Sequence, residues 1–429
     1  MNASTIARVR GRRVFDSRGR PTVEAEVTLR GGAIGRAIAP AGASRGSREA
    51  IDLRDGGPRF GGFDVTDALA NVDGPIARLL QGADAREQAQ IDRLLIDADG
   101  TPNKSNFGGN AIVAVSLATA HAAAAAHHVP LWRYLARDQP VTLPLPEIQI
   151  FGGGAHAGRR IDIQDLMVMP IGAQSLGDAF EMIADIYRAA GALMEEAGRL
   201  AGVADEGGYW PQFESNEDAL SMLVRAIERA GLRPGIDAAL SLDIAASEFS
   251  RDGRYILTRD GRDLDRDDMV DLILGWVERF PIVSIEDPLG EEDVEGWRRF
   301  TRAAGARVQI VGDDLLTTDA ARVADAAAQR LCNAALIKPN QAGTLTESRA
   351  ALETAKKASL ATIVSARSGE SEDVSIAHLA VGWNAGQIKV GSFARSERMA
   401  KWNELLRIEE SLAGAARYAG AGAMQPIAR

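Results

Sequence analysis

The chain has 429 residues, which is long enough for one large barrel with a smaller domain, or for two to three domains. Hydrophobic residues make up 46% and charged residues 25%, so there are ample apolar side chains for a core. Acidic residues outnumber basic ones by 59 to 49, and the net charge of −10 argues against nucleic acid or an anionic membrane as a partner. The single cysteine, Cys332, excludes an internal disulfide and favours a reducing, cytoplasmic setting.

The first part of the chain predicts an antiparallel sheet. Residues 22–29 (TVEAEVTL) alternate apolar and polar side chains with period two, as in a strand with one buried face. Gly31 and Gly32 then lead into residues 33–40 (AIGRAIAP), and the two runs together indicate a hairpin. The small residues of segment 41–47 (AGASRGS) predict a mobile loop.

Helical patterns fill the chain from there to about residue 136. The most apolar of them, residues 111–128, is dominated by alanine and short for a membrane span, which favours a buried helix. Residues 138–147 (DQPVTLPLPE) contain three prolines and are the best candidate for a domain boundary, although prolines are also common at the entrance of barrels. We therefore expect one domain over residues 1–137 and a second over residues 138–429.

The second part of the chain repeats a unit made of one short apolar run and one helix-length amphipathic segment, such as residues 266–280 or 345–358. The intervals suit one strand, one helix and two loops. Repeated strand–helix units predict an α/β fold with a parallel sheet, and their number favours a closed β/α barrel. The polar residues at or near the ends of the apolar runs are Asp243, Glu286, Asp313, Lys338, Arg367 and Lys389.

These six side chains should converge, because a barrel presents the carboxyl ends of its strands at one mouth. A polar residue at a single strand end also arises where the chain simply emerges into water, but six in register favour a site. Asp243, Glu286 and Asp313 supply carboxylates whose mutual repulsion requires a cation or partial protonation. Oxygen ligands without a histidine or cysteine cluster indicate Mg²⁺ rather than Zn²⁺. The adjacent acids, Asp287 and Asp314, either support these carboxylates or pair with neighbouring bases.

Lysine and arginine side chains at the same mouth suggest acid–base chemistry on an anion. A partly desolvated lysine among cations loses its proton readily, so Lys338 or Lys389 could act as a base. The alternative for either lysine is a salt bridge to the carboxylates. Arg367 and Ser368 offer a guanidinium and a hydroxyl that suit a phosphate or a carboxylate.

The segment VADEGGYWP (203–211) supplies a further candidate. Glu206 follows a strand-like run, and the glycines behind it let loops approach closely. A glutamate that stays protonated in such a site can donate to a leaving hydroxyl, with Asp205 in a supporting role. Among the histidines, His156 in the loop GGGAHAGRR is placed to join the site. The other four are assigned structural roles: His121, His127, His128 and His378.

Several motifs resemble the enolase family in order and spacing over nearly the whole chain. They include DSRGRPTVEAEV, DEGGYWP, LDIAASEF, SIEDPL, VGDDL, LIKPNQAGTLTE and RSGESEDVSIA. The resemblance implies an N-terminal α+β domain followed by an eight-stranded β/α barrel that begins with an antiparallel irregularity. It also implies a glycolytic hydro-lyase, phosphopyruvate hydratase, which dehydrates 2-phosphoglycerate to phosphoenolpyruvate with Mg²⁺.

The resemblance also implies roles for individual residues. Lys338 would remove the proton beside the carboxylate, and Glu206 would assist departure of the hydroxyl. The Mg²⁺ that stabilises the enediolate would be held by Asp243, Glu286 and Asp313. The substrate, a small phosphorylated carboxylate, would be bound by His156, Asp165, Arg367, Ser368 and Lys389. The family is typically a homodimer, and the matching interface charges are Arg18, Glu24, Arg407 and Glu410.

Some positions depart from the family pattern, and they cluster on the substrate loops. Ala41 replaces a serine whose hydroxyl serves a second Mg²⁺, Ala366 replaces a histidine, and Asp165 shortens a glutamate. The new arginines could supply the charge of a missing cation, or they could simply be solvated loop residues. These arginines are Arg45, Arg159 and Arg160.

Three functions therefore stay open. The first is a working enolase, which the complete set of base, acid and metal ligands favours. The second is an enolase-family dehydratase for a related acid, such as a phosphonate analogue, which the changed substrate loops favour. The third is a catalytically weak homologue with a binding or scaffold role.

Overall fold

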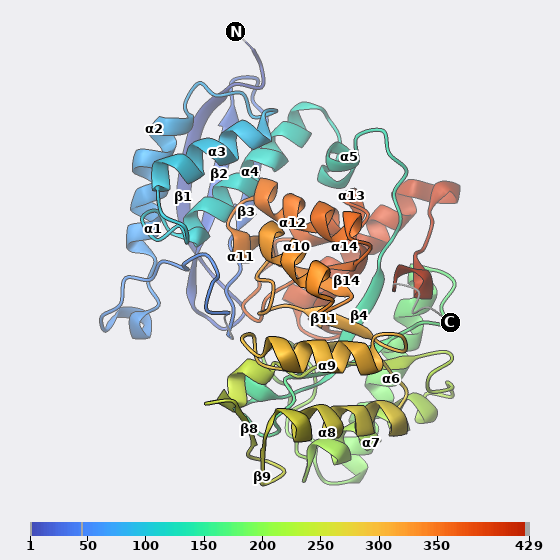
Figure 1. The fold of residues 1–429 in the computed structure, drawn as a ribbon. Coiled ribbons are helices and arrows are strands. Elements are labelled where there is room, and N and C mark those ends of the chain that lie inside the picture. The colour runs from blue at the N-terminus through green and yellow to red at the C-terminus, as the bar shows by residue number, and fades with distance from the viewer. Residues whose placement is uncertain (1, 44–45, 425–429) are drawn as a thin grey trace.

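The computed structural model describes residues 2–43 and 46–424, which form two lobes (Figure 1). The N-terminal lobe opens with an antiparallel sheet in the order β1–β2–β3. Its second strand covers the predicted run, and the turn that follows contains Gly32 at a φ of 88°, which confirms the hairpin. The strands are β1 (Ile6–Phe15), β2 (Pro21–Leu29) and β3 (Ile34–Ile38).

Helices complete the described part of this lobe. The alanine-rich segment forms α4, which is long and apolar enough to cross a membrane by length and composition alone. However, 83% of its apolar window is buried inside the protein, as predicted for a core helix. It packs very closely on β3, since a Cβ at Gly35 would lie 2.1 Å from the carbonyl oxygen of Ala118. The helices are α1 (Thr66–Asn71), α2 (Ala77–Leu80), α3 (Gln88–Asp99), α4 (Gly109–Ala126) and α5 (Leu131–Ala136).

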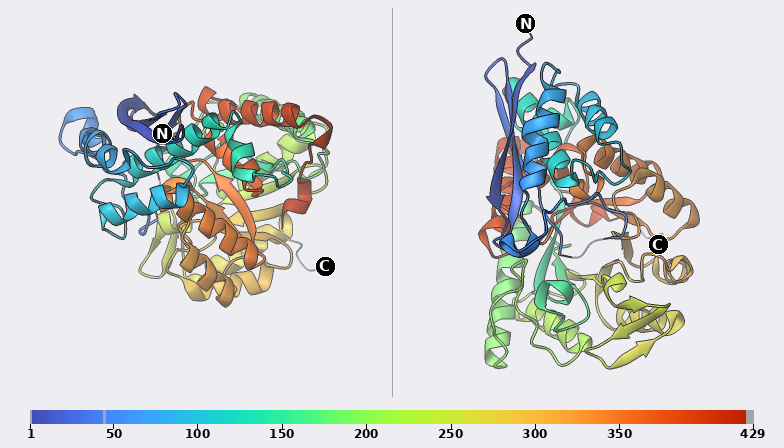
Figure 2. Two further views of the ribbon diagram at one scale, coloured as in Figure 1. Left: turned by 90° about the horizontal axis from the view of Figure 1, so that it is seen from above. Right: turned by 90° about the vertical axis from the view of Figure 1, so that its left-hand side faces the viewer.

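Helix α4 also connects the two lobes. It contacts β2 and β3 on one side, and α11 (Pro339–Ala342) and α12 (Leu345–Lys357) of the second lobe on another. Figure 2 shows the β1–β3 sheet at the outer edge of the N-terminal lobe. The chain leaves this lobe after α5 and enters the second one at β4. The division between residues 137 and 138 stays a prediction.

The second lobe is a closed barrel of eight strands. Neighbouring strands are parallel except at β5, which runs antiparallel to both β4 and β6. This arrangement confirms the predicted fold class, including the antiparallel irregularity. In barrel order the strands are β4 (Leu145–Gly152), β5 (Asp165–Met169), β6 (Ala239–Asp243), β10 (Ile282–Glu286), β11 (Gln309–Gly312), β12 (Ala334–Ile337), β13 (Ala361–Ser365) and β14 (Gly386–Ser392).

Helices surround the barrel (Figure 1), and α8 and α12 correspond to the two amphipathic segments predicted from the sequence. Many begin with a side chain that accepts a hydrogen bond from the first turn: Ser175, Ser215, Asp265, Asp293, Asp319 and Thr344. The remaining helices are α6 (Leu176–Glu196), α7 (Asn216–Arg229), α8 (Arg266–Arg279), α9 (Val294–Ala304), α10 (Ala320–Gln329), α13 (Ser375–Gly382) and α14 (Ser396–Leu412).

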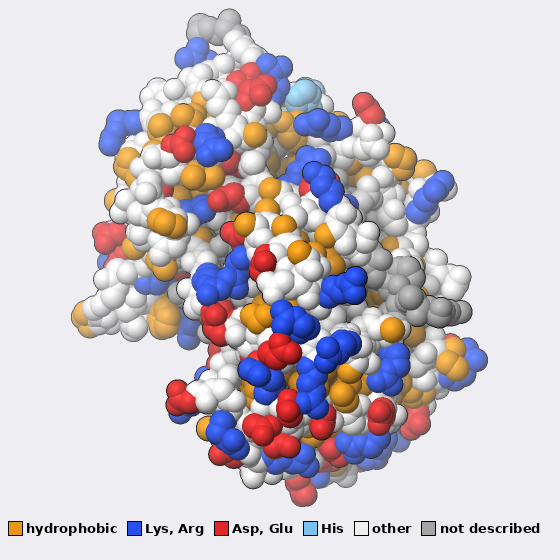
Figure 3. Space-filling view, in the orientation of Figure 1, with side chains coloured by type: hydrophobic (Ala, Val, Ile, Leu, Met, Phe, Trp, Pro, Cys, Tyr) orange, Lys and Arg blue, Asp and Glu red, His pale blue; other side chains and the backbone are white. Residues whose placement is uncertain are grey.

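Two surface features complete the lobe. A small antiparallel sheet follows β6 in the chain and consists of β7 (Ser250–Arg251), β8 (Arg254–Leu257) and β9 (Arg262–Leu264). On the face in Figure 3, cationic and anionic side chains alternate over the lower part of the barrel lobe. One example is Arg299 of α9, which pairs with Asp267 and Asp271 of α8. Such exposed pairs contribute little to stability.

Candidate active site

Four of the predicted strand-end residues lie where the sequence pattern puts them. Asp243 ends β6 and Glu286 ends β10, while Asp313 directly follows β11 and Lys338 directly follows β12. All four are buried. Because the four strands are parallel to one another, these residues share one mouth of the barrel.

Lys389 reaches the same mouth from inside a strand, so its predicted position at a strand end is wrong. β14 continues to Ser392 because it pairs with β4 as far as Gln149. The ammonium of Lys389 donates to Oδ2 of Asp243 and to Oε2 of Glu286, both at 2.8 Å. The lysine therefore bridges two carboxylates on neighbouring strands and supplies one positive charge to the pair.

The carboxylates at the mouth could hold a metal ion. Burial and the charge of Asp243 raise the pKa of Glu286 well above its ordinary value. One oxygen of Glu286, Oε1, is buried and has no hydrogen-bond partner among the described residues. An unpaired buried oxygen is costly, and carboxylate oxygens are the ligands that Mg²⁺ prefers. Asp243, Glu286 and Asp313 thus fit a divalent cation by their chemistry.

Lys338 forms an ion pair with Asp313. Burial lowers the pKa of the ammonium, but the nearby carboxylates, Asp313 first and then Glu286, together leave the pKa above its ordinary value. The expectation that Lys338 loses its proton readily is therefore wrong for this arrangement of charges. The adjacent anion has a larger effect than the cations Arg367 and Lys389, which act in the opposite direction. Lys338 can become a base when another positive charge engages Asp313.

Asp287 and Asp314 form a second acidic cluster with Asp313. The carboxylate of Asp287 accepts hydrogen bonds from the backbone N–H groups of Asp313 (2.9 Å) and Asp314 (2.8 Å). Burial and the charge of Asp313 raise the pKa of Asp314 to about 8. No base pairs with Asp287 or Asp314 within the described part of the chain, so of the two predicted roles the structure shows support of the Asp313 segment.

Glu206 lies on a loop between α6 and α7, so its predicted position at a strand end is wrong. In place of a strand, this loop has isolated bridges from Tyr209 to Val203 and to Phe151 of β4. It is nevertheless held against the barrel, since the carbonyl oxygen of Glu206 accepts a hydrogen bond from the N–H of Ser392 at 3.0 Å. A Cβ at Gly208 would lie 2.5 Å from Oε1 of Gln149, so the glycine permits the close approach that the sequence predicted.

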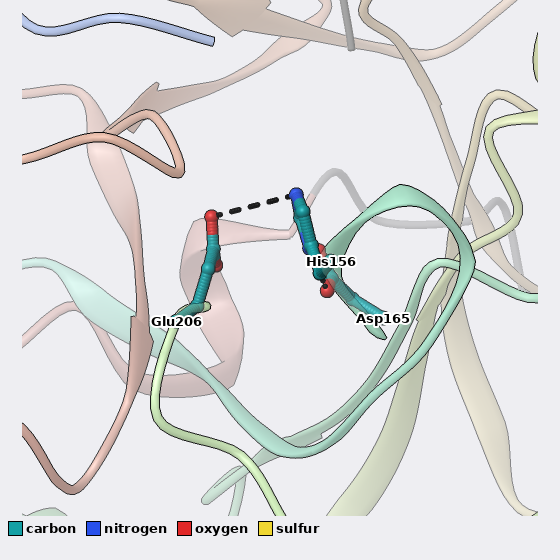
Figure 4. Close-up of side chains that lie close together, drawn as sticks. All are labelled: His156, Asp165 and Glu206. Carbon is teal, nitrogen blue, oxygen red and sulfur yellow. Dashed lines mark hydrogen bonds and ion pairs between the residues drawn. The ribbon is translucent and has the colours of Figure 1, made fainter. Parts of the chain in front are cut away.

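His156 lies between two carboxylates (Figure 4). Its Nδ1 is 2.9 Å from Oδ1 of Asp165, and its Nε2 is 3.8 Å from Oε1 of Glu206. Burial alone would lower the pKa of His156, but the two carboxylates raise it to about 9. Asp165 begins the antiparallel strand β5 and also accepts a hydrogen bond from Nε2 of Gln149 at 2.5 Å. The imidazole therefore holds a proton next to Glu206 at neutral pH.

Arg367 and Ser368 follow β13 and contact the N-terminal lobe. Nη1 and Nη2 of Arg367 donate to Glu49, at 2.8 and 3.1 Å, and the hydroxyl of Ser368 accepts from Arg18 at 3.3 Å. Burial alone would lower the pKa of Arg367, but Glu49 raises it above the ordinary value. Glu49 was not predicted from the sequence, because a contact across 318 residues leaves no local signal.

A narrow cavity of about 20 Å³ brings most of the predicted residues together. Glu286 and Asp313 do not line it but contact lysines that do. Gln164 and Ser365 also line the cavity and were missed, although Gln164 directly precedes Asp165 and motif order could have revealed it. The predicted residues around the cavity are His156, Asp165, Glu206, Asp243, Lys338, Arg367, Ser368 and Lys389.

The positions that depart from the family pattern divide into two groups. Ala366 lines the cavity, and Ala41 is buried beside it, where its backbone pairs with that of Gly369. Arg159 is exposed and pairs with Glu248 at 2.6 Å. Neither Arg159 nor the exposed Arg160 lines the cavity, which favours their interpretation as solvated loop residues. Arg45 lies outside the described residues.

The fold and the site together define a class: a two-domain protein in which an α+β lobe covers the mouth of a β/α barrel whose carboxylates, lysines and imidazole surround one small cavity. Residues 6–135 match the family model described as the enolase N-terminal domain. Residues 140–427 match the model described as the enolase C-terminal TIM barrel domain. The chain belongs to the enolase family.

Proposed function

We propose that this protein dehydrates 2-phosphoglycerate to phosphoenolpyruvate with Mg²⁺ as a cofactor. The observation that carries the proposal is that the candidate base, Lys338, and the candidate acid, Glu206, line one cavity with Arg367 and Ser368. Loss of water across two adjacent carbons needs a base for the proton and an acid for the hydroxyl.

Asp243, Glu286 and Asp313 are the proposed metal ligands. Bound there, Mg²⁺ would stabilise the negative charge that develops on the substrate carboxylate and would offset the charge of Asp313 beside Lys338. The proposal is supported by the unpaired, buried Oε1 of Glu286 and by the all-oxygen donor set. Lys338 then takes the proton from the carbon next to the carboxylate.

The proposed acid is the pair formed by Glu206 and His156. The pKa of His156 is about 9, so this side chain holds a proton 3.8 Å from Oε1 of Glu206. Glu206 passes a proton to the leaving hydroxyl, which departs as water from the carbon next to the deprotonated one. Arg367 and Ser368 hold the phosphate, and Lys389 lies at the substrate carboxylate.

A second candidate is dehydration of a related phosphorylated or phosphonate acid. Ala366 on the cavity wall and Ala41 next to the cavity favour it, because neither offers the polar group found there in the family pattern. The altered positions lie on loops, whereas the proposed base, acid and first-metal ligands are all present. The chemistry would then be retained while the preferred substrate or the need for a second Mg²⁺ changes.

One assay separates these functions. Dehydration of 2-phosphoglycerate is measured against Mg²⁺ concentration for the parent protein and for the double variant Ala41→Ser with Ala366→His. A fast parent supports the enolase reaction and rejects the altered substrate. A slow parent that the double variant accelerates marks these two positions as the cause. Failure of 2-phosphoglycerate and its phosphonate analogues with both proteins favours a binding or scaffold role.

We also propose a homodimer, as is typical of the family. Among the four predicted interface charges, Arg407 and Glu410 are exposed, while Glu24 pairs with Arg12 and Arg18 contacts Ser368 within the chain. The proposal therefore depends mainly on the α14 positions. Light scattering during size-exclusion chromatography tests it: a dimer mass supports the proposal, and a monomer mass at micromolar concentration rejects it.

A further inference from the structure

Arg398 on α14 is a fully buried arginine that contacts backbone carbonyl groups. Its Nη1 donates to the carbonyl oxygens of Arg367 (2.7 Å) and Val390 (2.8 Å), and its Nη2 donates to that of Ser368 (2.5 Å). Its nearest carboxylate is the side chain of Glu397, at 3.6 Å. The relative exposure of its side chain is 0%. One guanidinium thus joins the segment after β13 to β14.

The three carbonyl groups belong to a specific part of the site. Arg367 and Ser368 are the residues whose side chains line the cavity as candidates for holding the phosphate, and Val390 directly follows Lys389. When a guanidinium fixes the carbonyl groups of two successive residues, it fixes the peptide planes and therefore the directions of both side chains. Arg398 contacts these carbonyl groups but does not itself line the cavity.

The rest of the segment is held by other groups. Oε1 of Glu370 accepts the N–H of Arg367 at 3.0 Å, and Nζ of Lys401, also fully buried on α14, donates to the carbonyl oxygen of Ser371 at 2.6 Å. Lys401 also pairs with Glu370 at 3.0 Å. Two buried cations one helical turn apart therefore hold opposite ends of the segment. The hydroxyl of Ser17 also donates to the carbonyl oxygen of Ser368, at 3.3 Å, but among the described residues Arg398 is the one that contacts the carbonyls of both Arg367 and Ser368.

Burying a guanidinium is costly unless its N–H groups find partners, and Nε of Arg398 has no hydrogen-bond partner among the described residues. A planar guanidinium can hold several carbonyl groups in a fixed geometry, which a lysine ammonium cannot reproduce. We infer that Arg398 is a positioning residue, which fixes Arg367 and Ser368 for anion binding and aligns them with the strand that carries Lys389. The inference rests on the proposed phosphate-holding role of Arg367 and Ser368.

The test compares Arg398→Lys with Arg54→Lys as a matched control. Arg54 lies in the N-terminal lobe and likewise donates to two backbone carbonyls, those of Pro21 (2.5 Å) and Phe63 (2.8 Å). Hydrogen exchange of the peptide covering residues 366–371 is measured together with the affinity for inorganic phosphate by calorimetry. Arg398→Lys should speed exchange in this peptide and weaken phosphate binding about tenfold, as expected for loss of one charged hydrogen bond. Arg54→Lys should change neither.

Turnover gives a second reading. If the parent dehydrates 2-phosphoglycerate, Arg398→Lys should raise KM more than it lowers kcat. A parent that binds no phosphate and turns over no substrate rejects the proposed function, while the exchange of peptide 366–371 still tests the positioning of the segment. If hydrogen exchange in that peptide is no faster in Arg398→Lys than in Arg54→Lys, the inference is overturned. The inference is also overturned if the parent binds phosphate and Arg398→Lys shows faster exchange but binds phosphate as tightly as the parent does.

A further variant covers the case in which Arg398→Lys does not fold. Arg398→Ala is purified with low concentrations of guanidinium chloride, whose cation can occupy the space left by the side chain. Dialysis of the guanidinium should slow turnover or weaken phosphate binding while the far-ultraviolet circular dichroism stays unchanged. Loss of the dichroism in step with phosphate binding would show a purely structural role and overturn the inference.

Discussion

The two halves of the candidate site are held in different ways. The strand half, consisting of Asp243, Glu286, Asp313, Lys338 and Lys389, lies on barrel strands or directly after them. Its charges are balanced by neighbours within the group, as where Lys389 contacts both Asp243 and Glu286. The loop half, consisting of Glu49, His156, Glu206, Arg367 and Ser368, is assembled from segments that lie far apart in the chain.

Two of the departures from the family pattern follow this division, while a third, Asp165, begins the barrel strand β5. Ala41 and Ala366 lie in segments of the loop half, whereas every residue of the strand half agrees with the family motifs. A rigid barrel holds its side chains whatever the loops do, and loops tolerate substitution because few contacts depend on them. The proposed base and metal ligands are therefore built into the barrel, while the proposed acid and the candidates for holding the phosphate lie on loops that are more open to change.

The strand half should dominate the rate. Lys338→Ala removes the proposed base and should lower kcat by about 10²–10⁴-fold, the usual contribution of a general base. Lys356→Ala is the matched control, since this lysine of α12 donates to the carbonyl oxygen of Trp383 and lies outside the cavity. Steady-state kinetics with 2-phosphoglycerate measure both variants. A Lys338→Ala variant within a few-fold of the parent would remove Lys338 from the mechanism.

In the loop half, the substitution expected to reduce stability most is one that breaks the buried ion pair between Glu49 and Arg367. Glu49→Gln leaves the guanidinium of Arg367 without its buried counterion and should lower the free energy of unfolding by about 3 kcal/mol. Inorganic phosphate should restore more stability to this variant than to the parent, because the anion supplies the missing charge. Urea unfolding with and without phosphate measures this. Asp267→Asn is the control, which breaks an exposed pair with Arg299 and should leave the stability nearly unchanged.

Two buried histidines, His156 and His378, should make the stability of the protein depend on pH in opposite directions. The folded pKa of His156 is about 9, above the unfolded value of about 6.5, so the folded state holds the extra proton between these values. Its contribution to stability is complete below about pH 6.5 and is lost as the pH rises through 9, by at most about 1.4 kcal/mol per pH unit. His156→Gln should flatten this decline in urea unfolding, and His127→Gln, an exposed position, should not.

His378 provides the opposite case outside both halves. Burial, and then the positive charge of His121 at a ring distance of 6.2 Å, lower the pKa of His378 to about 4. The unfolded state binds the extra proton between about pH 4 and 6.5, so stability is complete above this range and falls as the pH falls through it. His378→Gln should weaken that acid sensitivity. An unchanged slope below pH 6.5 would contradict a neutral His378.

Much of the strand half could be predicted from the sequence, because its signals are local. Asp243 and Glu286 each end a short apolar run, and the repeat of strand and helix implies that such ends meet. The same local reasoning explains why the hairpin after Leu29 and the buried helix α4 were predicted correctly. In each case the pattern of side chains directly reflects the environment of the backbone.

Four residues of the loop half were also predicted, but the contacts that hold this half together could not be predicted in this way. The pairing of Arg367 with Glu49 depends on how the lobes pack, and the position of Glu206 depends on a loop without regular structure. The protonation of Lys338 was also missed, since it is decided by the Asp313 carboxylate in direct contact and not by the number of cations nearby. Lys389 was assigned to a strand end because sequence alone does not show how far β14 pairs with β4.

The antiparallel strand β5 has a consequence for how this protein can vary. Since β4 and β5 run in opposite directions, the connection between them turns back at the mouth instead of crossing the outside of the barrel through a helix. Residues 158–160 of this connection are exposed, so exchanges there can reshape the entrance, whereas Ile161 and Ile163 are buried in the core and the backbone beside them is hydrogen-bonded to Asn216 of α7. The same connection carries His156, so its exposed tip is a place where new selectivity can arise beside the site while the core stays unchanged.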